Sequence, residues 1–293
     1  MTPEHRFCRS NGIEIHYVRQ GSGLPLILLH GWPEFWRAWR KVIGPLSQTF
    51  DVIAPDLRGF GQSSKPPVPA LEGYRVEDHA ADLAGLADAL GFDRFGLVSH
   101  DVGAYVAQTF ARMHPERVVG LFFFNCPYPG IGRRWGEADH LREVWYQWFH
   151  QLPVAAEVVG SSRTSTERYI RHFLGHWAHH PGAFDEDDVA AWVDNFSLPG
   201  NIQGGFNWYV ASGPGRLDLV RHGAPDLPPI ELPTRVRWGV SDPILKVEWA
   251  DRLGEYFADC DFAPVEEAGH FVAHERPDIA VAEISDFFGR LST

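Results

Sequence analysis

The sequence predicts an α/β fold: a mostly parallel central sheet with helices on both faces and an inserted helical segment. Three observations lead to this prediction. Short, continuous apolar runs recur in the first half of the chain, at residues 24–30, 50–56, 95–100 and 118–126. Segments of helical length separate these runs, and this alternation is typical of a parallel sheet whose strands are buried on both sides. After residue 126 the alternation stops, and it resumes only at 234–239.

The first elements can be assigned from turn signals and periodicity. The run "GIEIHYV" alternates apolar and polar residues after the turn signal Asn11-Gly12, which predicts an early hairpin strand. The segment "RVEDHAADLAGLADALG" predicts a helix, because apolar residues such as Val76, Leu83 and Leu86 recur at helical spacing.

The region in which the alternation stops is rich in Trp, His and Phe and is predicted to be helical. Pro- and Gly-containing stretches bound it at residues 127–132 and 212–233. We therefore expect a core formed by residues 1–130 and 231–293, interrupted by a helical cap at 131–230.

Composition excludes several kinds of partner. The chain has 293 residues, 44% of them hydrophobic, and a formal net charge of -12 without any Lys/Arg block, which argues against nucleic-acid or membrane-surface binding. The cysteines Cys8, Cys126 and Cys260 are far apart, as in a reducing compartment. The N-terminus lacks an apolar signal core, so we expect a cytoplasmic protein. The sequence leaves the oligomeric state open, with a homodimer as one option.

Three candidate catalytic side chains directly follow predicted strands. Asp101 lies in "SHDVGA", Asp242 in "WGVSDP" and His270 in "EEAGHF". The carboxyl ends of parallel strands meet at one edge of a sheet, where active sites collect. The small residues around Asp101 indicate a tight strand-to-helix turn that exposes a nucleophile. A fourth motif, "HGWP" at residues 30–33, follows the first long apolar run.

Together these motifs resemble the α/β-hydrolase superfamily and, within it, the epoxide hydrolases that use an aspartate nucleophile. The matching blocks stand in family order between residues 30 and 270: "HGWPEFWRAWR", "APDLRGFGQSSKP", "SHDVGA", "YQWFHQLPVAAE", "FNWYV", "WGVSDP" and "AGHF". The resemblance implies the α/β-hydrolase fold and a hydrolase that needs no cofactor.

The resemblance also implies a role for each motif. A serine would form an ether with an epoxide carbon, which no general base could hydrolyse, whereas the carboxylate of Asp101 would form an ester. His270, oriented by Asp242, would activate the water that attacks this ester. The backbone N–H groups of Trp32 and Val102 would hold the oxyanion of the tetrahedral intermediate.

Two tyrosines of the expected cap match the family's acid pair. Tyr146 lies in "YQWFHQLP" and Tyr209 in "NWY". A phenol with a pKa of about 10 stays protonated at neutral pH and can still give its proton to an alkoxide. No family block surrounds Tyr105, Tyr128 or Tyr169, which are therefore poorer candidates.

The substrate is expected to be a small, apolar epoxide, because aromatic residues are frequent in the expected cap. The candidate substrate-binding residues are Trp32, Pro33, Trp145, Phe149 and Phe206. Pro33 resembles a cis-proline of the family.

Other histidines are given structural roles. His172, His176 and His180 are four residues apart, but no Cys or carboxylate completes a metal motif, so we expect a polar helix face and no metal. His100, beside the proposed nucleophile, is expected to be a packing residue.

Two other functions are alternatives to epoxide hydrolysis on this fold: dehalogenation and non-catalytic binding of a small molecule. Haloalkane dehalogenases and many epoxide hydrolases carry Trp, and fluoroacetate dehalogenases Arg, where this chain has Val102. Val102 supplies neither an indole N–H for a departing halide nor a guanidinium for a substrate carboxylate, which argues against either halide chemistry. Some relatives place the acid after the preceding strand, but Asn125 stands there and an amide cannot replace a carboxylate. A non-catalytic small-molecule receptor of the same fold would not need an intact nucleophile, acid and histidine.

Overall fold

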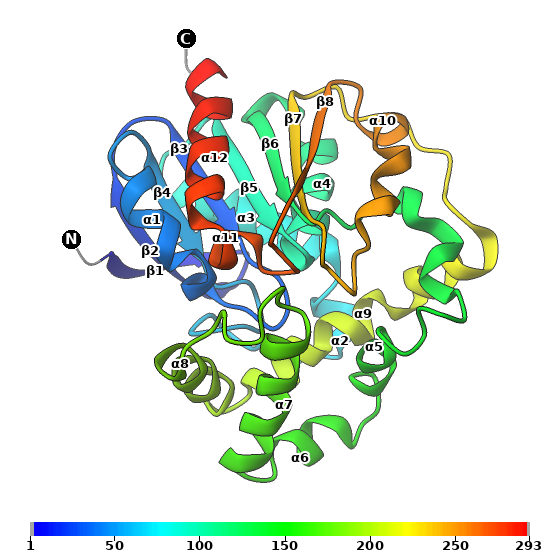
Figure 1. The fold of residues 1–293 in the computed structure, drawn as a ribbon. Coiled ribbons are helices and arrows are strands. Elements are labelled where there is room, and N and C mark those ends of the chain that lie inside the picture. The colour runs from blue at the N-terminus through cyan, green and yellow to red at the C-terminus, as the bar shows by residue number, and fades with distance from the viewer. Residues whose placement is uncertain (1–2, 292–293) are drawn as a thin grey trace.

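A single eight-stranded sheet organises the chain, as the computed structural model of residues 3–291 shows (Figure 1). The strand order is β1-β2-β4-β3-β5-β6-β7-β8. The strands are β1 (Glu4–Ser10), β2 (Ile13–Gly21), β3 (Pro25–Leu29), β4 (Asp51–Pro55), β5 (Phe95–His100), β6 (Val118–Phe124), β7 (Thr234–Gly239) and β8 (Cys260–Val265). The pairs β1–β2 and β2–β4 are antiparallel, and the pairs from β4 to β8 are parallel. The predicted α/β class is confirmed.

Helices cover both faces of the sheet. The α-helices are α1 (Arg40–Leu46), α2 (Ala70–Gly73), α3 (Val76–Ala89), α4 (Val102–Met113), α5 (Trp145–Phe149), α6 (Ala155–Gly160), α7 (Arg163–His176), α8 (Glu186–Phe196), α9 (Asn201–His222), α10 (Leu253–Tyr256), α11 (Val272–Glu275) and α12 (Pro277–Leu291). Short 3-10 helices are η1 (Trp36–Trp39), η2 (Pro115–Arg117), η3 (Pro129–Gly136) and η4 (Val247–Arg252).

Alternate residues of the central strands pack into two separate hydrophobic cores. On β5, Leu97 packs into the core that contains α3 and α4, whereas Val98 packs into the core that contains α1 and α12. Successive side chains of a strand point to opposite faces, so a strand buried on both sides must be apolar at every position. This explains why the strands appeared in the sequence as continuous apolar runs.

The chain between β6 and β7 forms η3 and helices α5 to α9, and no strand among its described residues. In Figure 1 most of this segment lies at one end of the sheet, beyond the loops that follow the parallel strands. Ser162 caps the N-terminus of α7 and Asp185 that of α8, and each side chain accepts a hydrogen bond from the backbone N–H three residues later. Residues 131–230 are called the inserted segment below. Most of this segment thus lies at the edge of the sheet where Asp101, Asp242 and His270 follow their strands.

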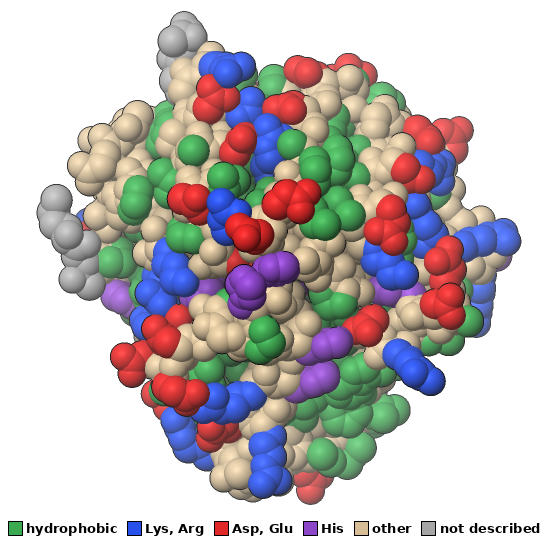
Figure 2. Space-filling model, in the orientation of Figure 1, with side chains coloured by type: hydrophobic (Ala, Val, Ile, Leu, Met, Phe, Trp, Pro, Cys, Tyr) green, Lys and Arg blue, Asp and Glu red, His purple; other side chains and the backbone are tan. Residues whose placement is uncertain are grey.

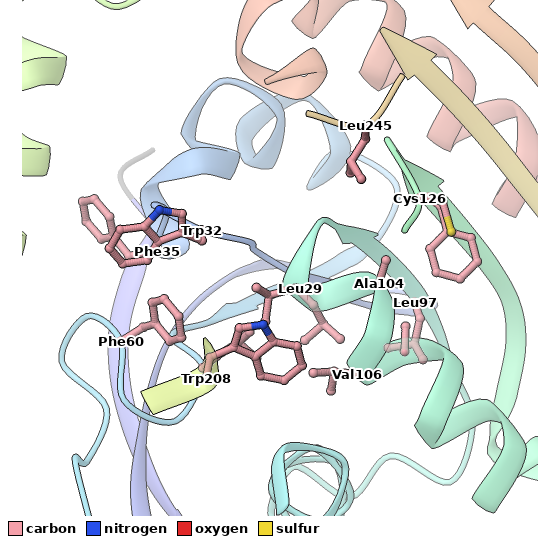
Figure 3. Packing of buried hydrophobic residues seen from close by; sticks show 14 of the residues in the cluster. Leu29, Trp32, Phe35, Phe60, Leu97, Ala104, Val106, Cys126, Trp208 and Leu245 are labelled. Carbon is pink, nitrogen blue, oxygen red and sulfur yellow. The ribbon is translucent and has the colours of Figure 1, made fainter. Parts of the chain in front are cut away.

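The inserted segment shares its hydrophobic core with the sheet. Figure 3 shows members of the larger core cluster, among them Trp208 from α9 together with Leu29 from β3 and Val106 from α4. On the outside, acidic and basic side chains are interspersed over the face drawn in Figure 2, without a large area of one sign.

Candidate active site

Asp101 occupies a strained turn between β5 and α4. Its backbone has φ 47° and ψ -115°, which is unusual for a residue other than glycine. A Cβ atom added to Gly103 would lie only 2.4 Å from the backbone oxygen of Leu29. The small residues of "SHDVGA" are therefore required by the close approach of α4 to β3 (Figure 3).

The backbone after β3 lies against the Asp101 carboxylate. The Trp32 N–H donates a hydrogen bond to Asp101 Oδ1 at 2.9 Å, and the Trp32–Pro33 peptide bond is cis. Val102 is the first residue of α4, where backbone N–H groups have no acceptor within the helix. A Cβ on Gly31 would lie 2.4 Å from the Cβ of Asp101, so this approach also depends on a glycine.

His270 and Asp242 form a buried pair. His270 Nδ1 lies 2.8 Å from Asp242 Oδ2, and both side chains are fully buried. The other carboxylate oxygen, Oδ1, accepts the backbone N–H groups of Ile244 and Leu245 at 2.8 and 3.0 Å. His270 Nε2 is buried and has no hydrogen-bond partner within residues 3–291. One imidazole nitrogen is thus fixed and the other remains free for proton transfer.

Asn125 supports this pair rather than replacing the acid. Its Nδ2 donates to Asp242 Oδ2 at 2.5 Å and to the Gly269 carbonyl at 3.1 Å. Its Oδ1 accepts the Gly239 N–H at 3.0 Å. The amide therefore ties together the ends of β6 and β7 and the loop that carries His270.

The carboxylates around His270 favour its charged form. Burial works against the imidazolium, but the charges of Asp242, Asp101 and Glu34 outweigh it and raise the pKa of His270 to about 9. Burial alone would also raise the pKa of Asp242, yet the interaction with His270 and the hydrogen bonds to its oxygens leave that pKa lowered.

Glu34 and His100 form a second buried pair beside the first. Glu34 Oε2 lies 2.8 Å from His100 Nδ1 and accepts the Gly31 N–H at 2.9 Å. The charge of His100 overcomes the effect of burial and lowers the pKa of Glu34 to about 2. The rings of His100 and His270 are 4.5 Å apart. His100 is thus packed as expected, but the sequence analysis missed its partner Glu34, although this residue directly follows "HGWP".

Tyr146 from α5 and Tyr209 from α9 lie next to each other. Their ring centroids are 5.5 Å apart and nearly perpendicular, and Tyr209 is 6.0 Å from the indole of Trp32. Gln147 Nε2 donates to Tyr146 Oη at 3.2 Å. Burial is the main cause that raises the pKa of both phenols, and the charge of Asp101 adds to it. Both tyrosines therefore remain protonated over the physiological range and lie within electrostatic reach of Asp101.

An aromatic wall surrounds this group, and His150, which the sequence analysis missed, belongs to it. His150 stacks on Phe206 at 3.8 Å and contacts Trp32 and Tyr209 at 4.7 and 4.6 Å. Trp177 contacts Tyr146 at 5.0 Å and His270 at 5.0 Å. The pattern "YQWFHQLP" contains His150, but no sequence signal marks Trp177 as a neighbour of His270.

The predicted substrate-binding residues differ in burial. Phe206 is buried and its ring lies 5.5 Å from Trp32. Phe149 is half-buried, and its ring centroid is 6.5 Å from that of Phe206. Trp145 is 39% exposed and packs on Phe149. It lies next to Tyr146 on α5, and adjacent helical residues point in different directions.

Neither a metal nor a membrane site emerges from the described residues. His172 and His176 stack on α7 at 5.4 Å, His176 pairs with Glu143, and His180 lies beyond the end of the helix. Within residues 3–291 no group of three or more His, Cys, Asp or Glu side chains is arranged to hold a metal ion. No helix in the same range combines the length and apolar character needed to span a membrane.

This geometry, with an acid-supported histidine opposite a strand-to-helix turn, is the arrangement of hydrolases on a doubly covered parallel sheet. The chain belongs to the α/β-hydrolase fold family, whose model matches residues 25–277. Among curated proteins it is similar to the soluble epoxide hydrolase of Corynebacterium sp. (strain C12), with 34% identity over 98% of each chain. The expected resemblance to soluble epoxide hydrolases is thereby confirmed.

Solved structures agree with this placement. The epoxide hydrolase CorEH, determined without ligand, has a TM-score of 0.86 and 32% identity, covering 99% of this chain and all of that one. The Bacillus megaterium epoxide hydrolase in complex with an inhibitor has a TM-score of 0.85 and 26% identity, covering 97% of this chain and all of that one.

Proposed function

We propose that the protein hydrolyses a small, apolar epoxide to a vicinal diol through a covalent ester on Asp101. One arrangement carries the proposal: the Asp101 carboxylate at the nucleophile turn accepts the Trp32 N–H at 2.9 Å and lies within electrostatic reach of two adjacent buried tyrosines, whose pKa values are raised mainly by burial and further by the charge of Asp101. A nucleophile and protonated acids that share one small space are the groups that epoxide opening requires.

In the proposed first step, an oxygen of Asp101 attacks one epoxide carbon and the bond from that carbon to the ring oxygen breaks. The developing alkoxide takes a proton from Tyr146 or Tyr209, which leaves a tyrosinate and a hydroxyalkyl ester. Because the two phenols are neighbours, they can hold the ring oxygen together, and the loss of one leaves a second donor.

In the proposed second step, His270 takes a proton from water, and the resulting hydroxide adds to the carbonyl carbon of the Asp101 ester. The N–H groups of Trp32 and Val102 stabilise the oxyanion. The tetrahedral intermediate then collapses, the ester bond breaks, and the carboxyl proton passes to the departing alkoxide to give the diol. The tyrosinate has by then taken the proton that His270 carried in the resting protein, and His270 keeps the proton taken from water, so atoms and charges balance.

The ester itself prepares His270 for the second step. In the resting protein the negative charge of Asp101 is one of the causes that raise the pKa of His270 to about 9. Esterification removes that charge, so the pKa of His270 falls when a neutral base is needed. Before this step, the imidazolium can donate its proton to the tyrosinate formed in the first step.

We further propose that residues 131–230 form a cap over this site, between core parts 1–130 and 231–293. The apolar lining of the site is formed by Trp32, Pro33, Phe149 and Phe206. His150 contacts Trp32 and Phe206 and also lines a neighbouring cavity. That cavity, of about 530 Å³, lies between Lys65–Ala70 and α9 and has His150 in its wall.

The test is the reaction of the purified protein with styrene oxide. We expect the diol as product, and little or no halide from short haloalkanes or from fluoroacetate. Asp101→Asn should abolish diol formation. Rapid halide release without diol, or ligand binding without turnover of any epoxide, would replace the proposal with the dehalogenase or the receptor alternative.

A further inference from the structure

A second pocket opens on the surface next to the proposed catalytic residues. It has a volume of about 370 Å³ and lies between the start of α3, the outer face of α4 and the middle of α9. Among the residues that line it are Arg75, Glu77, Tyr105, Trp208 and Arg216. None of the roles proposed above uses this pocket.

Two neighbouring polar groups in this pocket are buried without an acceptor. Tyr105 Oη and Arg216 Nη1 are both inaccessible to solvent, and apart from the interaction of the two side chains with each other neither atom has a hydrogen-bond partner within residues 3–291. Arg216 also forms no ion pair with any carboxylate in that range, and its guanidinium lies 3.4 Å from the ring centroid of Trp135. Buried donors without acceptors are costly, and the cost is greatest for a charged group. An anionic oxygen would satisfy both groups at once.

The pocket lies beside the proposed site, because α4 and α9 contribute residues to both. Tyr105 lies four residues after Asp101, which places it one turn away on the same side of α4. Arg216 lies seven residues after Tyr209 on α9, two turns or roughly 10 Å further along the helix. The positive charge of Arg216 also opposes the rise in the pKa of Tyr146 and of Tyr105, after the dominant effect of burial.

We propose that Arg216 and Tyr105 bind a carboxylate of the substrate, so that the preferred substrates are epoxides with an acidic end group. This proposal rests on the proposed function. The guanidinium supplies a fork of donors that fits a carboxylate, and the phenol adds one more. At the rim, exposed Arg75 is paired with Asp78 at 3.1 Å, so Arg216 is the cation without a carboxylate partner among the residues that line the pocket.

The test compares ω-epoxy carboxylic acids of increasing chain length with their methyl esters. We expect kcat/KM for the acid to exceed that for the ester at the lengths that span the two sites. Arg216→Gln should reduce the acid-to-ester ratio on the order of tenfold to a hundredfold, and Tyr105→Phe by a smaller factor. Arg221→Gln removes the same charge from an exposed position on α9 and should leave the ratio unchanged.

Several outcomes would overturn the inference. An equal loss for acid and ester in Arg216→Gln would mean that the guanidinium acts on the reaction in general, through Tyr146. No preference for acids at any length, with neutral esters still hydrolysed, would remove the carboxylate site and leave the proposed function intact. If acetate inhibited the hydrolysis of neutral epoxides and acids alike, the pocket would hold a free anion and not the end of the substrate.

A binding measurement separates this inference from catalysis. Octanoate, measured by calorimetry, should bind the wild type at least tenfold more tightly than Arg216→Gln, whereas octanol should bind both alike. If Arg216→Gln does not fold, Tyr105→Phe serves in its place. Equal binding of octanoate to the wild type and the variants would refute the carboxylate site even if no epoxide were turned over.

Discussion

The backbone N–H of His270 donates a hydrogen bond of 2.8 Å to the carbonyl oxygen of Trp177, and the two rings lie 5.0 Å apart. His270 follows the last strand of the core, whereas Trp177 directly follows helix α7 of the inserted segment as its C-cap residue. Trp177 also contacts Tyr146 at 5.0 Å. A single side chain thus connects the proposed base to a proposed acid across the two parts of the fold.

Trp177→Leu should therefore impair both half-reactions as well as stability. The indole is 1% exposed, and its truncation should cost about 3 kcal/mol in the free energy of unfolding. Urea denaturation gives this cost, and rapid-quench kinetics gives the rates of ester formation and hydrolysis. Trp145→Leu, on the exposed side of the inserted segment, is the control. Unchanged rates in a folded Trp177→Leu protein would show that the contact has no role in positioning.

His270→Gln should stop the reaction after the first step. If Asp101 attacks carbon, the variant should consume about one epoxide per site and remain as an ester. Mass spectrometry should then find the adduct on the peptide that carries Asp101. In wild-type protein, a single turnover in oxygen-18 water should label Asp101 and leave the first diol unlabelled. Label in that first diol, without an adduct in the variant, would instead indicate direct attack of water on the epoxide.

The two tyrosines should be partly redundant. Tyr146→Phe and Tyr209→Phe should each retain some activity, whereas the double variant should lose the acid contribution of roughly a hundredfold to ten-thousandfold. The loss should appear in the rate of ester formation, measured before the steady state. Tyr169→Phe, which removes a phenol that bonds to His150, is the matched control. A double variant with full activity would require another source of the proton.

The raised pKa of His270 predicts a pH-dependent stability. A base whose pKa in the folded state, about 9, exceeds its usual value of 6.5 binds its proton more tightly when folded. The resulting stabilisation is complete below about pH 6.5 and is lost as the pH rises through 9. Relative to His270→Gln, the wild type should thus lose a few kcal/mol between pH 6 and pH 10. A constant difference between the two proteins across this range would contradict the raised pKa.

Asp101→Asn should lower the pKa of His270, because it removes one of the carboxylates that raise it. Titration of the imidazole by NMR measures this shift without any turnover. Asp251→Asn, which removes a half-exposed carboxylate paired with Arg134, is the control for a general change in charge. If the pKa of His270 does not change in Asp101→Asn, esterification cannot prepare the base in the way proposed above.

Local sequence patterns determined the sheet, because strands buried on both faces must be apolar at every position and helices repeat their apolar residues every three or four positions. The turn at Asp101 could also be predicted from the sequence, because α4 approaches β3 so closely at Gly103 that no side chain fits there. The positions of Asp242 and His270 could be predicted because both residues follow strands, and the carboxyl ends of parallel strands lie at the same edge of a sheet.

Only the tertiary structure decided which side chains meet across the two parts of the fold. Glu34 pairs with His100 and Asn125 with Asp242 through hydrogen bonds between residues far apart in sequence, and no periodicity encodes such a pairing. Trp145 and Tyr146 are neighbours in sequence, yet one lies at the surface and the other is buried beside Tyr209. The direction of a side chain on a short helix depends on how that helix packs, which is a property of the whole fold and not of the local sequence.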